Sequence, residues 1–584
     1  MAENSSDLPR ECWEHIFNLL DDPSHFSSLS LVSKQFLYIT NRLLLTLKLS
    51  DSTLQSILPR LLHRFRWLKH IDLSGFSGDM NPLLYRIAIS GLNLESLNVS
   101  NQTCLPVNGI RVFGSKMMNL KCLDCSRVKF LQDSDLNLIA ESFPLLQELD
   151  ISYPEFGSTN SSTGSSDWKP ISDSGIFSLT LNLKGLRRIN LSGNHFITDL
   201  SLVHLSKHCV LLTQVVIHYC DFITQNGVAK LIRACCQLSC VSVCGIGGSL
   251  ICLLGYSSLS FGSVGCSLIS SRALSGIDFS DSVVSDELLC SVAEACFPMK
   301  KLVLSNCTSF TFAGISFLVS HYPFLEYLDL EGAYFLTDNE IIELSMSLHS
   351  ITYINLSYCS SLTGVTLYTL TRNSLVLNEI KMVGTNVGDE ALETDVMPNL
   401  GVKSLMLSQN TSMGNGFIAN YVSICPNLEL LDLSHCVNIT EDGIVEVLKR
   451  CSRIRHLEIN ECGLMKNISI DFELPKLEVL YARGLRIDDD MLAIIGKRCS
   501  RLQQLDLSGC LNVTANGVKQ VVANCKEIKE INLRSCDNVS VDIIPWMVFS
   551  RPSLKKIVQP CGGSVPTESQ RNHFLRHGCL VCEG

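Results

Sequence analysis

The chain has 584 residues, of which 46% are hydrophobic and 18% are charged, and its formal net charge is −10 at pH 7. The acidic balance argues against nucleic acid or an anionic membrane as a general partner, and no apolar run reaches the roughly 18 residues typical of a membrane-spanning helix. No apolar segment typical of a secretion signal follows the first residues, so we expect a cytoplasmic and/or nuclear protein whose 27 Cys stay reduced.

Residues 1–41 do not share the pattern of the rest of the chain, and they predict three helices separated by short breaks. Trp13, Ile16, Phe17 and Leu20 form the apolar stripe of the first helix.

These N-terminal helices resemble an F-box. The run LSLVSKQF at 29–36 carries the resemblance, together with the Leu-Pro pair at 8–9 and the Ile-Phe pair at 16–17. The sequence departs from the usual pattern at Ser33, where the family usually has Cys, and at Phe36, where Trp is common. The resemblance implies an interface with a Skp-type adaptor that is formed by Leu8, Pro9, Ile16, Phe17, Leu20, Leu29, Val32 and Phe36. Two questions stay open. The first is which of these residues form the F-box core. The second is whether the helices cap the first repeat in addition to binding an adaptor, or serve only as a cap.

From residue 42 to residue 559 the sequence repeats at a spacing of about 26 residues, in about 18 regular copies. The copy at 428–452, LELLDLSHCVNITEDGIVEVLKRCS, begins with an alternating run typical of a strand and continues, after Thr440 as a helix N-cap, into a helical stripe. One strand and one amphipathic helix cannot bury their apolar faces alone, so the copies must stack and pair their strands in parallel.

The repeats are identified as cysteine-containing leucine-rich repeats, because a Cys such as Cys436 or Cys510 follows the strand. The predicted fold class is therefore α/β. We expect a leucine-rich-repeat solenoid shaped as a horseshoe, with parallel strands on the concave side and helices on the convex side, and with a three-helix F-box at its N-terminal end.

Two insertions, at 153–170 and 244–272, interrupt the repeats. Each follows the end of a strand, so both are expected to emerge at the same rim of the solenoid. The first is rich in Ser, Gly and Thr, and the second also contains apolar residues. Partner binding and a tolerated surface loop remain alternatives for 153–170, whereas the apolar residues of 244–272 favour packing against the rim.

Residues 560–584 leave the repeat and are predicted to form a tail that caps its last copy. His573, His577, Cys579 and Cys582 have the residue types of zinc ligands, but their spacing matches no common zinc motif. We therefore predict no metal site.

The strand positions that face away from the helices predict a mixed, somewhat acidic surface. Its acidic members include Asp72, Asp124, Asp150, Asp278, Asp329, Asp432, Glu458 and Asp506. Because Leu-Asp-Leu-Ser is a common strand sequence, no single Asp is assigned to a partner. Tyr327, Tyr353 and Tyr481 are the candidates for contact with a target protein, since tyrosine is enriched at interface hot spots.

No catalytic motif is present: the sequence has no Gly-rich phosphate loop after a strand, no HExxH and no GxSxG that can be placed. We expect no enzymatic activity and no cofactor. The resemblance to F-box/leucine-rich-repeat proteins implies the substrate-recognition subunit of an SCF-type ubiquitin ligase. In that role the F-box binds a Skp-type adaptor and, through it, the cullin/RING ligase, and the solenoid binds a target protein for ubiquitination and proteasomal degradation. One alternative is a small-molecule-dependent co-receptor, as in the plant auxin and jasmonate receptor F-box proteins, which are similar in length and repeat number. The other is a ligase-independent scaffold.

Overall fold

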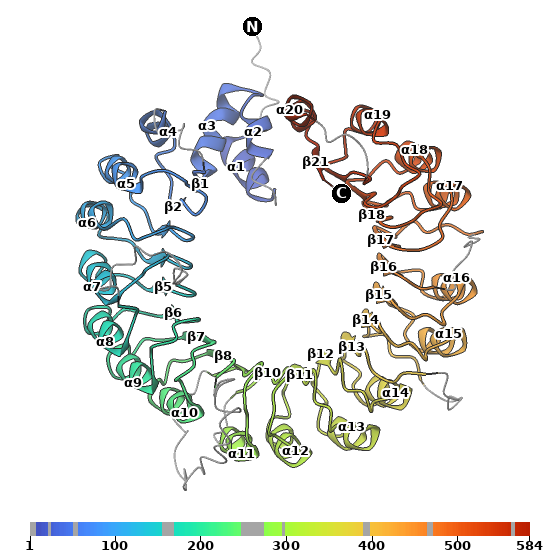
Figure 1. The fold of residues 1–584 in the computed structure, drawn as a ribbon, viewed down its shortest axis with the longest axis horizontal. Helices are drawn as coiled ribbons and strands as arrows, with labels where there is room; N and C mark the ends of the chain where they lie inside the picture. The colour runs from blue at the N-terminus through green and yellow to red at the C-terminus, as the bar shows by residue number, and fades with distance from the viewer. Residues whose placement is uncertain are drawn as a thin grey trace, which may run out of the picture. The chain divides into compact units, whose positions relative to one another are not determined.

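The computed structural model describes residues 8–20, 25–50, 57–154, 169–246, 274–294, 298–388, 397–463, 471–561 and 567–583. The bodies of both predicted insertions lie outside these residues. Within them, short strands alternate with helices (Figure 1), and no helix is long and apolar enough to cross a membrane.

The N-terminal helices are α1 (Arg10–Asn18), α2 (His25–Leu29) and α3 (Lys34–Leu43). Pro9 precedes the first turn of α1, a place that tolerates its missing N–H. Ser33 caps α3, because its hydroxyl accepts a hydrogen bond of 3.1 Å from the backbone N–H of Phe36. The departure from the usual F-box pattern at Ser33 therefore places an N-cap at this position.

The chain divides into two compact units. One is formed by residues 1–284 and 294–298 and includes these N-terminal helices, and the other is formed by residues 285–293 and 299–584. In the first unit each strand pairs in parallel with the strand of the following repeat, so that Leu123 lies opposite Leu149. Its strands are β1 (Thr46–Lys48), β2 (His70–Asp72), β3 (Ser96–Asn98), β4 (Cys122–Asp124), β5 (Glu148–Asp150), β6 (Arg188–Asn190), β7 (Gln214–His218), β8 (Cys240–Cys244) and β9 (Gly276–Asp278). Its helices are α4 (Leu58–Arg64), α5 (Met80–Ala88), α6 (Val107–Lys116), α7 (Asp133–Ser142), α8 (Asp173–Asn182), α9 (Asp199–His208) and α10 (Gln225–Ala234).

The second unit continues the same pattern, and Leu405, Leu431 and Leu457 lie opposite one another on consecutive strands. Its strands are β10 (Lys301–Val303), β11 (Tyr327–Asp329), β12 (Tyr353–Asn355), β13 (Glu379–Lys381), β14 (Ser404–Met406), β15 (Leu430–Asp432), β16 (His456–Glu458), β17 (Val479–Tyr481), β18 (Gln504–Asp506), β19 (Glu530–Asn532), β20 (Lys556–Val558) and β21 (Leu580–Cys582). Its helices are α11 (Asp286–Glu294, of which 286–293 belong to this unit), α12 (Phe312–His321), α13 (Asp338–Ser345), α14 (Gly364–Asn373), α15 (Asn415–Ile424), α16 (Glu441–Arg450), α17 (Asp489–Arg498), α18 (Ala515–Asn524), α19 (Ile543–Ser550) and α20 (Glu568–Arg576).

In each unit the helices lie along one side of the strands (Figure 1), and the apolar residues of both elements are buried. In the copy at 428–452, Leu431 of β15 and its flanking residues Leu428 and Leu433 are fully buried, and so is Ile444 of α16. The prediction of a leucine-rich-repeat solenoid with parallel strands is confirmed. We call the opposite side of each strand ladder, formed by the first and third residue of each strand, the strand face.

A ladder of hydrogen bonds joins the helix N-termini of successive repeats. Asp173 accepts bonds from the backbone N–H and the hydroxyl of Thr198, at 2.9 and 2.8 Å. Asp199, which directly follows Thr198 in the sequence, accepts the equivalent bonds from Thr224 at 2.8 and 2.7 Å. Asp489 accepts the same two bonds from Thr514. Each Thr also caps its own helix, so one Thr-Asp pair serves two neighbouring repeats.

A glycine leaves room for this ladder in the first turn of several helices. A Cβ at Gly517 would meet the Asp489 carboxylate and would lie 2.8 Å from Cδ1 of Leu492. We expect Gly517→Ala to lower the free energy of unfolding by about 1–3 kcal/mol because of this clash. At a helix position without such a clash, alanine in place of glycine would instead stabilise the helix. The measurement is the midpoint of urea unfolding. Gly463→Ala is the control, because a Cβ there meets nothing within 4 Å; equal midpoints for the two variants would contradict the steric argument.

The tail extends the strand ladder beyond residue 559. β21 pairs in parallel with β20, with Lys556 opposite Leu580, so residues 580–582 add a strand that the sequence pattern does not reveal. The rings of His573 and His577 pack against Phe549, with centroid distances of 5.6 and 4.9 Å. In the parts of the chain that the structure describes, no group of three or more His, Cys, Asp or Glu side chains could hold a metal ion.

Candidate protein-interaction surfaces

Three aromatic rings form the centre of the N-terminal helical segment. The ring centroids of Trp13 and Phe36 lie 4.8 Å apart, and those of Phe17 and Phe36 lie 5.0 Å apart. Phe17 is only 2% exposed, so the interpretation of Phe17 as an adaptor contact needs correction: it is a core residue that holds α1 against α3. Phe36 is half-buried in the same cluster.

The other predicted interface residues lie at the surface. Leu8, Pro9, Ile16, Leu20 and Val32 are exposed, whereas Leu29 is half-buried.

Sequence reasoning missed two exposed apolar residues nearby, Leu19 and Leu31, the latter 87% exposed. The i, i+3, i+4 spacing of Ile16, Leu19 and Leu20 could have identified Leu19. Leu31 lies in a turn, where helical periodicity gives no such signal. Exposed apolar residues gathered on one small helical segment are typical of an interaction site.

Two contacts join this segment to the first repeats, and a third holds α3 against α1. Arg64 of α4 donates a hydrogen bond of 2.9 Å to the side-chain oxygen of Asn41 in α3. Arg42, also in α3, lies 3.4 Å from the Glu14 carboxylate and its guanidinium lies 5.4 Å from the centroid of the Trp67 ring. The N-terminal helices and the solenoid therefore share side-chain contacts as well as a short connection.

Tyr327 and Tyr353 stack on each other on the strand face of the second unit. Their ring centroids lie 3.8 Å apart and the rings are nearly parallel, at 4°. The ammonium of Lys301 lies 4.5 Å from the Tyr327 centroid, and that of Lys381 lies 5.3 Å from the Tyr353 centroid. These four side chains, which we call the stacked tyrosine platform, span β10 to β13. Both rings are half-buried rather than exposed as we expected, because each is covered on one side by the other.

The third predicted tyrosine is separate from this platform. The Tyr481 hydroxyl donates a hydrogen bond of 2.9 Å to the side-chain oxygen of Gln504. It lines a recess of about 160 Å³ together with Asp506, Glu530 and Lys556. The structure therefore brings Tyr327 and Tyr353 together and leaves Tyr481 several repeats away.

The environment of these phenols keeps them neutral. Burial raises the pKa of Tyr353, and its hydrogen bond with Tyr327 raises it further. Burial also raises the pKa of Tyr481, followed by the negative charge of Glu458 and neighbouring carboxylates. At physiological pH both side chains can therefore donate a hydrogen bond.

Acidic residues of the strand face are used inside the fold. Asp506 accepts hydrogen bonds from the backbone N–H of Ser508 at 2.8 Å and from the side chain of Asn532, one repeat later, at 2.9 Å. Asp150 makes the equivalent bonds, with Ser152 and Asn190 as donors, each at 2.9 Å. These bonds support the view that a strand Asp is not by itself a partner site.

A comparison with known protein families matches residues 5–48 to the F-box domain. The chain carries an F-box. The match includes α1, α2 and α3 with their aromatic cluster, and β1 of the first repeat. The F-box is thus followed by the leucine-rich repeats of the two units.

Two solved structures show distant similarity. One chain of the crystal structure of the yeast Rad7 and Elc1 complex is 14% identical, with 77% of this chain and 83% of that chain covered and a TM-score of 0.35. One chain of the mouse RP105/MD-1 complex is 16% identical, with 89% and 79% covered and a TM-score of 0.43. At these TM-scores neither similarity bears on the function of this F-box protein.

The repeat cysteines have a role that sequence reasoning missed. Cys436 and Cys536 donate from Sγ to the backbone carbonyls of Leu407 and Leu507, each of which directly follows the strand of the preceding repeat, at 3.2 and 3.0 Å. Asn410, at the equivalent position, makes the same bond with its amide. Cys104, Cys436, Cys536 and Cys561 are free thiols.

Thiol reactivity should differ sharply between buried and exposed positions. Burial raises the pKa of Cys436 to about 12, whereas hydrogen bonds with the side chain and backbone of Ser535 lower the pKa of the exposed Cys561. Since the thiolate is the reactive form, iodoacetamide at neutral pH should label Cys561 first and Cys436 only after unfolding. Peptide mass spectrometry over time measures this, with exposed Cys104 as the comparison. Labelling of Cys436 as fast as Cys104 would contradict the expectation.

Proposed function

We propose that the chain is the substrate-recognition subunit of an SCF-type ubiquitin ligase. The F-box match at residues 5–48 carries this proposal, because F-box domains bind Skp-type adaptors. In this role the adaptor links the chain to a cullin/RING ligase in the cytoplasm and/or nucleus, and the solenoid holds a target protein for ubiquitination and proteasomal degradation. The chain contributes proximity between the target and the ubiquitin-conjugating enzyme, and no residue of its own takes part in the chemistry.

The apolar surface of the F-box supports the adaptor interface. Leu8, Ile16, Leu20, Leu31 and Val32 are all exposed, and burying apolar area contributes roughly 25 cal/mol per Å². Aromatic core packing behind this surface holds the helices in place without a partner, so the surface is formed before binding.

The experiment that tests the function uses the full chain and a separately produced Skp-type adaptor. The two should elute together from a size-exclusion column as a stable complex. A chain that is folded by circular dichroism but elutes apart from the adaptor would contradict the ligase role and would favour the ligase-independent scaffold.

The stacked tyrosine platform is our candidate for target contact. Its two rings are fixed by stacking, so little side-chain entropy is lost when a partner covers them, and tyrosine is enriched among interface hot spots. Tyr481 stays a weaker candidate, because its hydroxyl is already bonded to Gln504.

Changing both Tyr327 and Tyr353 to Ala should lower the recovery of target proteins by at least about 10-fold, since one hot-spot ring contributes about 2 kcal/mol. The measurement is quantitative mass spectrometry of proteins that co-purify with the full chain after proteasome inhibition. Tyr334→Ala, an exposed tyrosine of the same unit, is the control, and adaptor recovery should stay constant. Unchanged target recovery in the double variant would rule out the platform.

The co-receptor alternative depends on a cluster of cations for a polyphosphate or similar ligand. On and beside the strand face of the second unit, Lys381, Arg483 and Lys556 each lie within 4 Å of a glutamate carboxylate. This pairing supports a protein target in preference to a polyanionic small molecule.

A further inference from the structure

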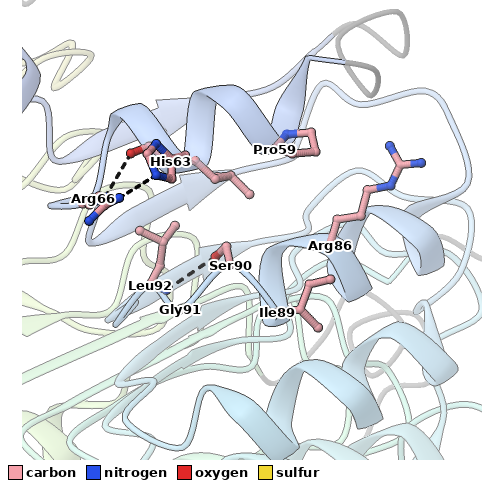
Figure 2. Close-up of a pocket in the computed structure, with 9 residues that line it drawn as sticks. Pro59, His63, Arg66, Arg86, Ile89, Ser90, Gly91 and Leu92 are labelled. Carbon is pink, nitrogen blue, oxygen red and sulfur yellow. Dashed lines mark hydrogen bonds between the residues drawn. The ribbon is translucent and has the colours of Figure 1, made fainter.

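A pocket of about 430 Å³ opens between α4 and the C-terminal end of α5, on the helix side of the first repeats (Figure 2). Its middle is apolar: Leu62 and Leu92 are buried beneath it, and Pro59 and Ile89 line its sides. The volume lies within the range of about 300–1,000 Å³ that is typical of ligand pockets. Neither the strand face nor the exposed F-box residues contribute to it.

Two arginines lie at the borders of this apolar middle. Figure 2 shows Arg66 and Arg86 on opposite sides of the pocket. Arg66 follows α4 and is held against the end of that helix by His63. It donates to the backbone oxygen of His63 at 3.2 Å and contacts Nε2 of the His63 imidazole at 2.5 Å. A guanidinium has five N–H groups, so these two bonds orient the fork and leave further donors for an anion.

The surrounding chain is strongly basic although the protein as a whole is acidic. The segment 58–70, LPRLLHRFRWLKH, contains four Arg or Lys and no Asp or Glu, whereas the formal net charge of the protein is −10. Lys69 and Lys121 both bind the Glu95 carboxylate at 2.8 Å, so this acid of the next repeat is already neutralised. The local field therefore favours a negatively charged partner.

We infer that this pocket binds an acidic segment of a partner protein that also carries an apolar side chain. The apolar side chain enters between Pro59 and Ile89, and a flanking carboxylate pairs with Arg66, since arginine binds carboxylates through paired N–H groups. Arg86 adds positive charge at the opposite border of the pocket. An inorganic anion would leave the apolar middle unfilled, whereas a peptide supplies both features. The inference does not depend on the ligase role.

The hydrogen bond from Arg64 to Asn41 ties α4 to the F-box. A partner held in this pocket therefore contacts a helix that is itself bonded to α3 of the F-box. The pocket can add a second contact for an assembly on the F-box, or it can recruit a separate regulator.

The test is selection from a random twelve-residue phage library on the full chain, with the Arg66→Ala/Arg86→Ala variant as the counter-selection. We expect enrichment of peptides that combine Leu or Phe with Glu or Asp. The best peptide, labelled with fluorescein, should bind the full chain in fluorescence anisotropy. Its Kd should rise at least about 10-fold with the double variant, and equally when its Glu and Asp are changed to Gln and Asn.

Arg111→Ala/Lys116→Ala on α6 removes the same charge from exposed positions outside the pocket and should leave the Kd within about 2-fold. Equal weakening by this control would show general charge attraction and overturn the inference. Enrichment of no acidic and apolar class would also overturn it. So would arginine-dependent binding of phosphatidylserine vesicles without peptide binding, which would assign the pocket to a lipid headgroup.

Discussion

Changing Leu31 and Val32 together to Asp is expected to weaken adaptor binding by at least about 100-fold. These side chains are 87% and 65% exposed, so the changes remove apolar contact area without opening a cavity in the F-box. Two carboxylates buried without partners at an interface are costly, and hot-spot residues contribute about 2 kcal/mol or more each. The Kd for a Skp-type adaptor, measured by surface plasmon resonance on the full chain, gives the result directly.

A matched control separates this effect from a general loss of surface apolarity. Leu375 and Met397 are 73% and 84% exposed and belong to the second unit. Their double change to Asp should leave the Kd within about 2-fold. An adaptor affinity that survives the Leu31 and Val32 changes would move the interface elsewhere on the F-box.

Phe17→Ala should also abolish adaptor binding, but for a different reason. Phe17 is buried and its ring packs against Trp13 and Phe36. Removing a buried phenylalanine costs about 3–5 kcal/mol, which exceeds what a three-helix segment of this size can lose. We expect the helices α1 to α3 to unfold locally while the leucine-rich repeats of both units stay folded.

Hydrogen exchange measured by mass spectrometry distinguishes the two mechanisms. Phe17→Ala should remove the protection of amides in 10–18 and 34–43, whereas the Leu31 and Val32 changes should leave it intact. Full protection of both helices in the Phe17 variant, with adaptor binding retained, would show that the aromatic cluster is not the core of the F-box.

The repeat architecture was predictable from the sequence because it depends on periodicity alone. Alternating Leu residues determine which strand side chains are buried, as at Leu428, Leu431 and Leu433, and Thr440 marks the start of its helix as expected. Stacking the copies then follows from their equal length. The F-box motif was equally visible, since short spacings carry it.

Features that depend on contacts between repeats were not predictable. The stacking of Tyr327 on Tyr353 requires the register of β11 and β12, and it converts two expected exposed rings into a half-buried pair. Phe17 and Ile16 are adjacent in sequence and equally apolar, yet only the packing of α1 on α3 decides which one is core. The pocket between α4 and α5, with Arg66 and Arg86 at its borders, joins residues from two repeats whose side-chain directions the sequence does not give.

The bonds between helix N-termini have a consequence for how the protein can be lengthened or shortened. The segment from Asp199 to Thr224 begins with an acceptor and ends with its own donor. A tandem duplication of that segment would place each new Thr opposite a new Asp, so no bond would be lost. A duplicated segment that repeats Thr224 and Gln225 instead would lack the Asp, and the Thr of the next copy would have no acceptor. The chain therefore has natural units of insertion and deletion, and engineered versions with more or fewer repeats should be joined at a Thr-Asp pair.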